Sequence, residues 1–280
     1  MLTLLRLIAR LPLPLLHAAG ILLGWLTYLS DATVRRRMRD FSRQSRLPVK
    51  LWKNAAEMGK AVAELPALWL RPLTRAAALV KHVQGWELIE QAQQAGKGII
   101  FLTPHLGCFE ITSHYYSQRR PITVLYRPPK LAWLIPLLTE GRKRPNISLA
   151  PANAQGVRQL LQALKRKEAI GILPDQVPGA GEGVWTAFFG RPAYSMTLAA
   201  RLAVKSGATV LLVYAERLSW GRGFRIVIHP LQQAIPDDAT AGTRIINQAV
   251  EQLIAQLPNQ YLWSYNRYKR PRGAPEAPAC

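Results

Sequence analysis

Short apolar runs alternate along this chain with longer segments whose apolar residues recur at helical spacing. The apolar runs are rich in β-branched residues and lie at 98–103, 122–126, 169–173, 208–214 and 224–230. Runs of this kind are typical of strands that are buried on both faces of a sheet. Helices are expected at 86–95, 110–117, 155–166, 195–205 and 239–257. The alternation predicts an α/β fold in which helices flank a largely parallel central sheet.

The N-terminal segment differs from the rest because residues 11–29 contain no formally charged side chain. As a helix, this segment would be about 28 Å long, close to the roughly 30 Å thickness of a bilayer's hydrocarbon core. Arg6 and Arg10 precede it, and a denser basic cluster follows at 35–39. Because the denser cluster is C-terminal, we expect the remainder of the chain on the cytoplasmic side of a membrane.

Pro12, Pro14 and His17 count against a simple spanning helix, and "LTYLSDA" is a poor signal-peptide cleavage site. A spanning helix, a helix that lies in the membrane interface and a buried core helix all stay open. We favour a membrane anchor of one of the first two kinds over residues 1–30. A single domain is then expected over 31–270, followed by a mobile tail over 271–280 with three prolines.

The composition and net charge of the chain limit the kinds of molecule that it is expected to bind. Hydrophobic residues make up 49% of the chain, which excludes a disordered chain, and 37 basic residues oppose 16 acidic ones to give a formal net charge of +21. Such an excess indicates anionic partners: a membrane surface, a phosphorylated substrate, an acidic protein or nucleic acid. A non-catalytic protein that binds membranes or nucleic acid is the rival class. The basic helix or aromatic-studded sheet of a nucleic-acid reader is not evident, so no nucleic-acid partner is expected.

The stretch "FLTPHLGCFE" carries the first candidate chemistry, His105 and Glu110. Pro104 ends the preceding strand, which puts His105 in a loop at the edge of the sheet where α/β proteins bind ligands. Gly107 allows a tight turn through which Glu110, at the start of the next helix, can meet the imidazole. A carboxylate bonded to one ring nitrogen leaves the other free to take a proton. A purely structural histidine is the alternative interpretation.

Metal binding is a weaker interpretation of the same stretch. His114 follows Glu110 at a spacing that suits two ligands on one helix face, but no third ligand is evident. The two cysteines, Cys108 and Cys280, are not spaced for zinc and imply no disulfide framework, which fits a reducing compartment. We therefore expect no metal and no cofactor.

Further polar residues follow other predicted strands. Arg127 comes after one strand, and Asp175 and Gln176 come after another, while Arg142 and Arg144 precede a further apolar run. Each of them alone is more typical of a solvated charge, a turn residue or a helix cap. Together they are expected at one edge of the sheet, where paired arginines suit phosphate or carboxylate oxygens.

At this point the sequence resembles a known family. "HLGCFE" is similar to the His-x4-Asp/Glu motif of the lysophospholipid acyltransferase superfamily. The ordered set of motifs resembles the lipid A late acyltransferases, the lauroyl and myristoyl transferases of Gram-negative envelopes, and the likeness covers nearly the whole chain. The motifs that carry it are "HLGCFE", "LYRPPK", "GRKRPN" and "ILPDQVPGAGEGVWTAFFGRPAYSMTLAARLAVKSGATVLLVYAER".

The resemblance implies transfer of an acyl chain from acyl carrier protein to a hydroxyl of a phosphorylated lipid A precursor at the bacterial inner membrane. His105 would be the general base and Glu110 would orient and polarise it, with no covalent acyl-enzyme. Substrate binding is implied for Asp175, Gln176, Arg127, Arg144 and Arg142. Trp185, Phe188 and Phe189 lie beside the expected site and are candidates to line an acyl channel, although ordinary core packing is the alternative for each.

Two alternatives stay open within this chemistry. The acceptor could be another glycolipid, an aminolipid or a lysophospholipid, and the donor could be acyl-CoA, since the motif residues do not separate these. A hydrolase is less well supported, because the chain has no Gly-x-Ser-x-Gly nucleophile elbow.

Overall fold

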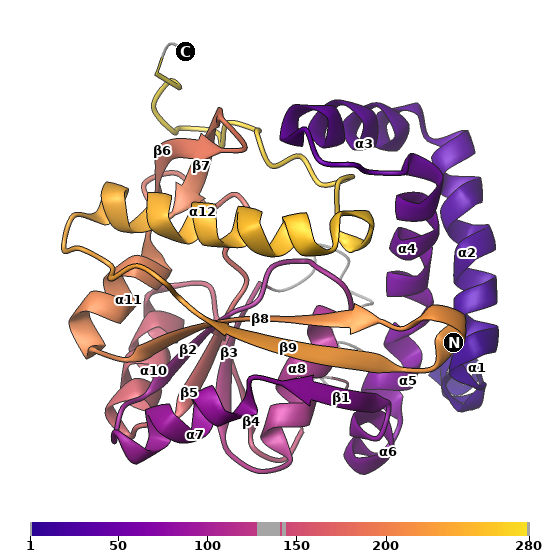
Figure 1. Ribbon diagram of the computed structural model, residues 1–280, viewed down its shortest axis with the longest axis horizontal. Coiled ribbons are helices and arrows are strands. Elements are labelled where there is room, and N and C mark those ends of the chain that lie inside the picture. Colours follow the sequence, from indigo (N-terminus) through magenta and orange to yellow (C-terminus); the bar gives the residue numbers. More distant parts are fainter. Residues whose placement is uncertain (1, 128–140, 142–143, 279–280) are drawn as a thin grey trace.

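The computed structural model describes residues 2–127, 141 and 144–278. Within these residues a twisted central sheet has the strand order β1-β9-β8-β2-β5-β3-β4, with helices on both faces (Figure 1). Neighbouring strands pair in parallel except β8 and β9, which are antiparallel. The predicted α/β fold with a largely parallel sheet is confirmed, and an apolar helix lies near the N-terminus as expected.

The strands of the central sheet are β1 (Val80–Gln84), β2 (Ile99–Leu102), β3 (Ile122–Tyr126), β4 (Ile147–Pro151), β5 (Ala169–Ile172), β8 (Thr209–Arg217) and β9 (Phe224–Pro230). A separate antiparallel hairpin consists of β6 (Gly183–Phe188) and β7 (Arg191–Met196). The helices are α1 (Leu2–Arg10), α2 (Leu13–Ser30), α3 (Ala32–Ser45), α4 (Leu51–Ala63), α5 (Leu65–Leu70), α6 (Leu73–Ala77), α7 (Trp86–Gln94), α8 (Phe109–Ser117), α10 (Ala154–Lys165), α11 (Leu198–Ser206) and α12 (Ala239–Gln256), with short 3-10 turns η2 (Ser219–Gly221) and η3 (Pro258–Gln260).

The sequence pattern missed β1, β4 and the β6–β7 hairpin. Both β1 and β4 are edge strands of the central sheet. The sequence "VKHVQ" of β1 carries polar residues at three of its five positions, and all three are exposed. Continuous apolar runs identify central strands, because both faces of these strands are covered. They do not identify edge strands such as β1, which carry polar residues.

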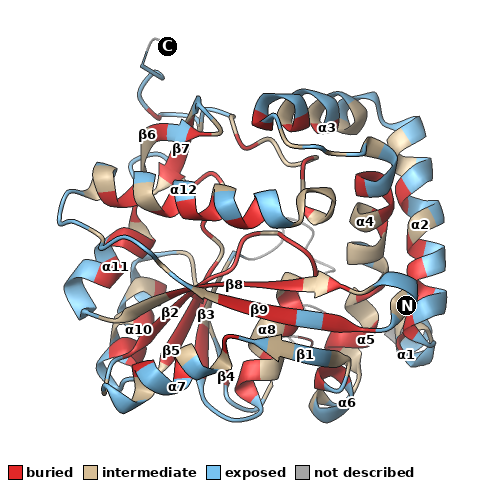
Figure 2. Cartoon of the chain, viewed as in Figure 1, coloured by how far each residue is buried: buried red, intermediate tan, exposed pale blue. Residues whose placement is uncertain are grey.

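Two apolar cores lie on opposite faces of the sheet, because successive side chains of a strand point to opposite sides. In β2, Ile99 and Phe101 belong to one core, and Ile100 and Leu102 belong to the other. Figure 2 shows the buried residues concentrated on the central strands and on the inward sides of the helices. The central strand β2 is therefore held on both faces, and so is the start of the loop that follows it.

The loop after β2 is held closely against β8. The amide of Cys108 donates to the carbonyl oxygen of Ala215 at 2.7 Å, and the amide of Gly107 donates to Gln260. Gly107 has a φ of 61°, and a β-carbon built on it would lie only 2.0 Å from the Ala215 oxygen. Only glycine suits both the conformation and the space, so the tight turn expected at Gly107 is present.

A chain of buried charges ties this loop to the N-terminal helices. The Arg217 guanidinium donates to the carbonyl oxygen of Gly107 at 2.8 Å and to the Glu64 carboxylate at 2.7 Å. The other Glu64 oxygen lies 3.0 Å from Nε2 of His17, on α2. Burial opposes the ionisation of Glu64, but the charge of Arg217 and the hydrogen bonds from His17 and Arg217 lower its pKa to about 2.

Helix α2 packs lengthwise against α4 through small residues. A β-carbon built on Gly24 would lie 2.0 Å from the Ala55 carbonyl oxygen, and one on Gly59 would lie 1.9 Å from that of Gly20. Beyond this contact, the Trp25 indole donates to the carbonyl oxygen of Trp52 at 3.0 Å. Among the described residues, α2 is the helix whose length and hydropathy would suffice to cross a membrane.

Replacement of Glu64 by glutamine should lower the free energy of unfolding by about 3–5 kcal/mol, because the Arg217 charge would then be buried without its counter-ion. Urea denaturation followed by circular dichroism measures the change. The matched control is Glu90→Gln on α7, an identical chemical change at an exposed position, which should cost about 0.5 kcal/mol or less. Equal stability of the two variants would contradict a stabilising role of the Arg217–Glu64 pair.

The stabilisation that Glu64 provides should also depend on pH. The folded-state pKa lies below the ordinary value of 4.5, so the contribution is complete above pH 4.5 and is lost as the pH falls toward about 2. The stability difference between the wild-type chain and Glu64→Gln should therefore shrink on acidification through this range. Denaturation curves at a series of pH values test it, and a difference that grows on acidification would be the opposite of this expectation.

Candidate active site

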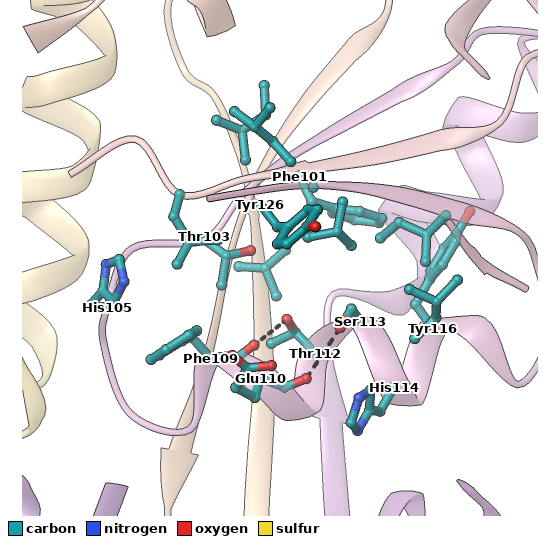
Figure 3. A pocket seen from close by; sticks show the side chains of 18 of the residues that line it. Phe101, Thr103, His105, Phe109, Glu110, Thr112, Ser113, His114, Tyr116 and Tyr126 are labelled. Carbon is teal, nitrogen blue, oxygen red and sulfur yellow. Dashed lines mark hydrogen bonds between the residues drawn. The ribbon is translucent and has the colours of Figure 1, made fainter. Parts of the chain in front are cut away.

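A cavity of about 240 Å³ lies between α8 and the sheet, next to the carboxyl ends of β2, β3 and β5. Its walls are mostly apolar and aromatic, with Phe101, Ile122 and Tyr116 among the residues that line it. Figure 3 shows His105 at one end of the cavity and Tyr116 toward the other, with Phe109 and Glu110 from α8 between them. The cavity therefore joins a polar end at the sheet edge to an apolar interior.

The imidazole of His105 pairs with the carboxylate of Asp175. Nδ1 of the ring lies 2.9 Å from one Asp175 oxygen, and the backbone amide of His105 donates to the other oxygen, also at 2.9 Å. The pairing follows from the sheet, because β2 and β5 run in parallel with Leu102 opposite Ile172. Continuing this register by three residues on each strand brings His105 beside Asp175.

The environment of Asp175 keeps its carboxylate ionised. Burial opposes ionisation, but the charge of His105 and the hydrogen bonds from its ring and amide hold the Asp175 pKa below the ordinary value of 3.8. An ionised carboxylate only accepts hydrogen bonds, so Nδ1 of His105 carries a proton and donates it. In the neutral form of the ring, the lone pair is then on Nε2, the nitrogen that can take a proton.

Gln176 occupies the position in front of that free nitrogen. Its side-chain nitrogen lies 3.1 Å from Nε2 of His105, which fits an amide N–H that donates to the ring lone pair. A hydroxyl group placed where this amide lies would be within reach of the same lone pair. Sequence reasoning named His105, Asp175 and Gln176, and the structure brings all three together.

Glu110 lies in the first turn of α8, as predicted, and lines the same cavity. Its carboxylate is buried and accepts a hydrogen bond from the Trp69 indole at 3.4 Å. The hydrogen bonds of the His105 ring go to Asp175 and Gln176, so the orienting position expected for Glu110 is held by Asp175. A catalytic role of Glu110 stays a prediction.

The predicted arginines occupy different environments. Arg127 lines the cavity, and its side chain is 58% exposed, with the guanidinium 4.0 Å from the Glu182 carboxylate. Arg144 donates to the carbonyl oxygens of Leu68 and Trp69, and this contact joins the segment before β4 to α5. Arg142 lies outside the described residues. Of the arginines that the structure describes, Arg127 is the one placed to meet a ligand at the cavity.

The aromatic residues expected to line an acyl channel lie on or next to the β6–β7 hairpin. Phe188 is buried in the core on the other face of the sheet from the cavity, with Phe189 packed against it. Trp185 packs on Tyr194 and donates its indole N–H to the carbonyl oxygen of Pro275 in the C-terminal segment. These three residues are not among those that line the cavity, and for Phe188 the core-packing interpretation applies.

Two buried residues near His105 and Asp175 escaped the sequence analysis. Arg267 is nearly fully buried, donates to the Tyr194 carbonyl oxygen and the Ser195 hydroxyl, and favours the Asp175 carboxylate through its charge. Burial raises the pKa of Tyr261 well above its ordinary value, and the negative charge of Asp175 is the second contribution in the same direction. Both follow α12 in the chain, where no strand end or motif marks them.

Within 2–127, 141 and 144–278, no three His, Cys, Asp or Glu residues converge as a metal site requires.

Comparison with known proteins agrees with this geometry. The sequence matches the family described as bacterial lipid A biosynthesis acyltransferase over residues 1–270. It is 28% identical to the lipid A biosynthesis lauroyltransferase of Escherichia coli K12, over 96% of this chain and 90% of that protein. It is also 28% identical to the palmitoleoyltransferase of the same organism, over 79% of this chain and 72% of the relative. A phosphatidylinositol mannoside acyltransferase of Mycobacterium tuberculosis is 25% identical over 71% of this chain and 63% of its own length.

The resemblance found in the motifs is thus confirmed over almost the whole chain, and the protein is an acyltransferase. The site agrees with that class, because it combines a hydrogen-bonded imidazole with an apolar cavity suited to a hydrocarbon chain. This chain belongs to the family of bacterial lipid A biosynthesis acyltransferases.

Proposed function

We propose that this protein transfers a fatty acyl chain from acyl carrier protein to a hydroxyl of a phosphorylated lipid A precursor, at the cytoplasmic side of the bacterial inner membrane. The observation that carries the proposal is the His105–Asp175 pair at the polar end of an apolar cavity. The cavity accepts the acyl chain, and the pair supplies the base. The basic chain, with a net charge of +21, suits an acidic carrier protein, a phosphorylated lipid and an anionic membrane.

The chemical step uses the neutral form of His105, in which the lone pair is on Nε2. The acceptor hydroxyl displaces the Gln176 amide, and its proton passes to Nε2 as its oxygen attacks the thioester carbonyl carbon. The tetrahedral intermediate collapses with cleavage of the carbon–sulfur bond. The departing thiolate then takes the proton from Nε2, which regenerates the neutral ring without a covalent acyl-enzyme.

Asp175 has the supporting role in this scheme. Its carboxylate fixes the tautomer of the His105 ring through Nδ1 and stabilises the positive charge that the ring gains in the transition state. Glu110, the acidic residue of the His-x4-Glu motif, lines the same cavity and is proposed as a second acidic residue of the catalytic site. The exposed Arg127 is proposed to bind a phosphate of the acceptor, with Arg144 and then Arg142 of the "GRKRPN" motif as further candidates.

The acceptor and donor have specific alternatives. The similarity to a phosphatidylinositol mannoside acyltransferase favours another glycolipid as the second candidate acceptor. The deciding experiment incubates the purified full-length chain with lauroyl- or myristoyl-acyl carrier protein, or with the matching acyl-CoA, and a phosphorylated glucosamine lipid. Mass spectrometry of the lipid product shows which donor and acceptor react, and an unchanged lipid with both donors would reject the proposal.

Substitution of His105 by alanine should lower kcat for acyl transfer by about 10²–10⁴-fold, because the base that takes the acceptor proton is lost. Steady-state transfer from radiolabelled acyl carrier protein measures the effect. His82→Ala, an exposed histidine on the edge strand β1, is the matched control and should keep wild-type rates. Near-normal transfer by folded His105→Ala would show that the ring is not the base.

The two acidic residues can be separated by isosteric replacement. Asp175→Asn should lower kcat by about 10²–10⁴-fold with little change in KM, since the amide no longer fixes the tautomer or stabilises the charged ring. Glu110→Gln should have a smaller effect on kcat if Asp175 is the orienting group. The reverse ranking, with Glu110→Gln the more damaging change, would return the orienting role to Glu110.

A further inference from the structure

The exposed apolar side chains of this protein are not scattered. Among the large apolar residues that are exposed in the described chain, all except Val204 belong to the N-terminal helices and the β8–β9 turn. Figure 2 shows the outward side of α2 as largely exposed. We define the apolar face by Leu4, Leu7, Leu11, Leu15, Leu22, Leu23, Trp25, Leu26, Leu29, Trp52, Val62 and Trp220. Exposed apolar residues concentrated in neighbouring segments in this way mark a site of interaction with a protein or a membrane.

The packing of α2 decides how such a face can meet a bilayer. Helix α2 is held against the rest of the chain at several points along its length: Pro14 lies close to Gly221, His17 bonds to Glu64, and Trp25 bonds to Trp52. Gly59 of α4 lies against Gly20, near the middle of α2. Helix α2 therefore does not project from the domain as an isolated rod.

A spanning α2 would carry its neighbours into the hydrocarbon. Lys60, next to Gly59, is ion-paired with Glu57 at 2.6 Å, so these charges lie near the level of the helix midpoint. Charges at the bilayer centre are strongly disfavoured, and so is the irregular backbone of the adjoining β8–β9 turn. A helix that lies in the plane of one leaflet avoids both penalties and keeps every contact of α2 with α4.

Trp220 gives the face a second point of attachment. It lies in the turn between β8 and β9, is 88% exposed, and has a φ of 62°. A bulky residue in the left-handed region is strained, and an exposed side chain obtains little compensation from the fold. Tryptophan is favoured at the boundary between lipid headgroups and hydrocarbon, which would account for its presence here.

The charges around the face select an anionic surface as its partner. Basic residues are frequent in the segments that carry the face or adjoin it in the chain, namely α1, α3, α4 and the turn with Trp220: Arg6, Arg10, Arg35, Arg36, Arg37, Arg39, Lys53 and Arg222. Apolar side chains bordered by basic ones are the features of a helix that binds in the interface of an anionic membrane. A protein partner of similar hydrophobicity would not need this excess of positive charge.

We infer that the protein docks onto one leaflet of an anionic bilayer through this apolar face, with α2 lying in the membrane plane and Trp220 inserted as a second anchor. The inference rests on the proposed function only for the choice of the cytoplasmic leaflet. It settles the orientation of the N-terminal segment in favour of a helix that lies on the membrane without crossing it.

The first test asks whether both ends of α2 face the same side of a membrane. In the full-length chain with Cys280→Ser, single substitutions Thr3→Cys and Ser30→Cys provide exposed thiols, while the native Cys108 is buried. In sealed inverted membrane vesicles, a membrane-impermeant maleimide should label both positions without detergent. Labelling of only one position until detergent is added would show that α2 crosses the bilayer and would overturn the inference.

The second test measures the contribution of Trp220. Binding to vesicles of phosphatidylglycerol and phosphatidylethanolamine should fall about tenfold for Trp220→Asn, which suits the left-handed backbone and removes the indole. Val204→Asn, at the exposed apolar position outside the face, should bind as the wild type does. Equal binding by Trp220→Asn and the wild type would exclude Trp220 as an anchor, and equal binding of the wild type to neutral phosphatidylcholine vesicles would exclude selection by charge.

These results can be separated from the proposed activity. Acyl transfer to an acceptor dispersed in detergent does not depend on docking, so Trp220→Asn should keep its wild-type rate in that assay. Loss of transfer there would mean that Trp220 acts on the fold or the site and would overturn its assignment as a membrane anchor. Labelling and vesicle binding need no acyl substrate, so they test the docking face even if the proposed reaction is incorrect.

Discussion

The parallel pairing of β2 with β5 is the constraint on which the site depends. Leu102 lies opposite Ile172, and the amide of Thr103 continues the ladder by donating to the Ile172 carbonyl oxygen at 3.0 Å. Because both chains leave the sheet at the same edge and in register, His105 and Asp175 emerge side by side. A shift of this register by one residue would separate ring and carboxylate and turn the strands' side chains to the wrong core.

Two sets of buried charged groups hold the loop between β2 and α8 in place, one at Asp175 and one at Arg217 and Glu64. On one side, the amide and the ring of His105 bind the Asp175 carboxylate, and on the other, Arg217 binds the Gly107 carbonyl oxygen and Glu64. Both carboxylates are buried, and each is kept ionised by a neighbouring cation or hydrogen-bond donor. Buried and paired charges are costly to rearrange, which gives the His105 ring a fixed position before any ligand arrives.

The same buried charges connect the site with the proposed membrane face. His17 on α2 contacts Glu64, which contacts Arg217, which contacts the loop that carries His105. A surface formed by α2 is thus linked through a chain of hydrogen bonds to the loop that carries His105. For an enzyme whose acceptor is a lipid, this continuity would hold the site at a set height above the leaflet from which the acceptor is drawn.

The sequence by itself determined the fold class, the central strands and the residues at their carboxyl ends, because burial on both faces leaves continuous apolar runs and prolines mark where they stop. It also carried enough ordered motifs to identify the acyltransferase family. Only the tertiary structure decided that Asp175 is the partner of His105, that Phe188 belongs to a core, and that β1 and β4 are edges. The physical reason is that periodicity records whether a residue is buried, whereas the choice of neighbour depends on strand order and on contacts between residues far apart in the chain.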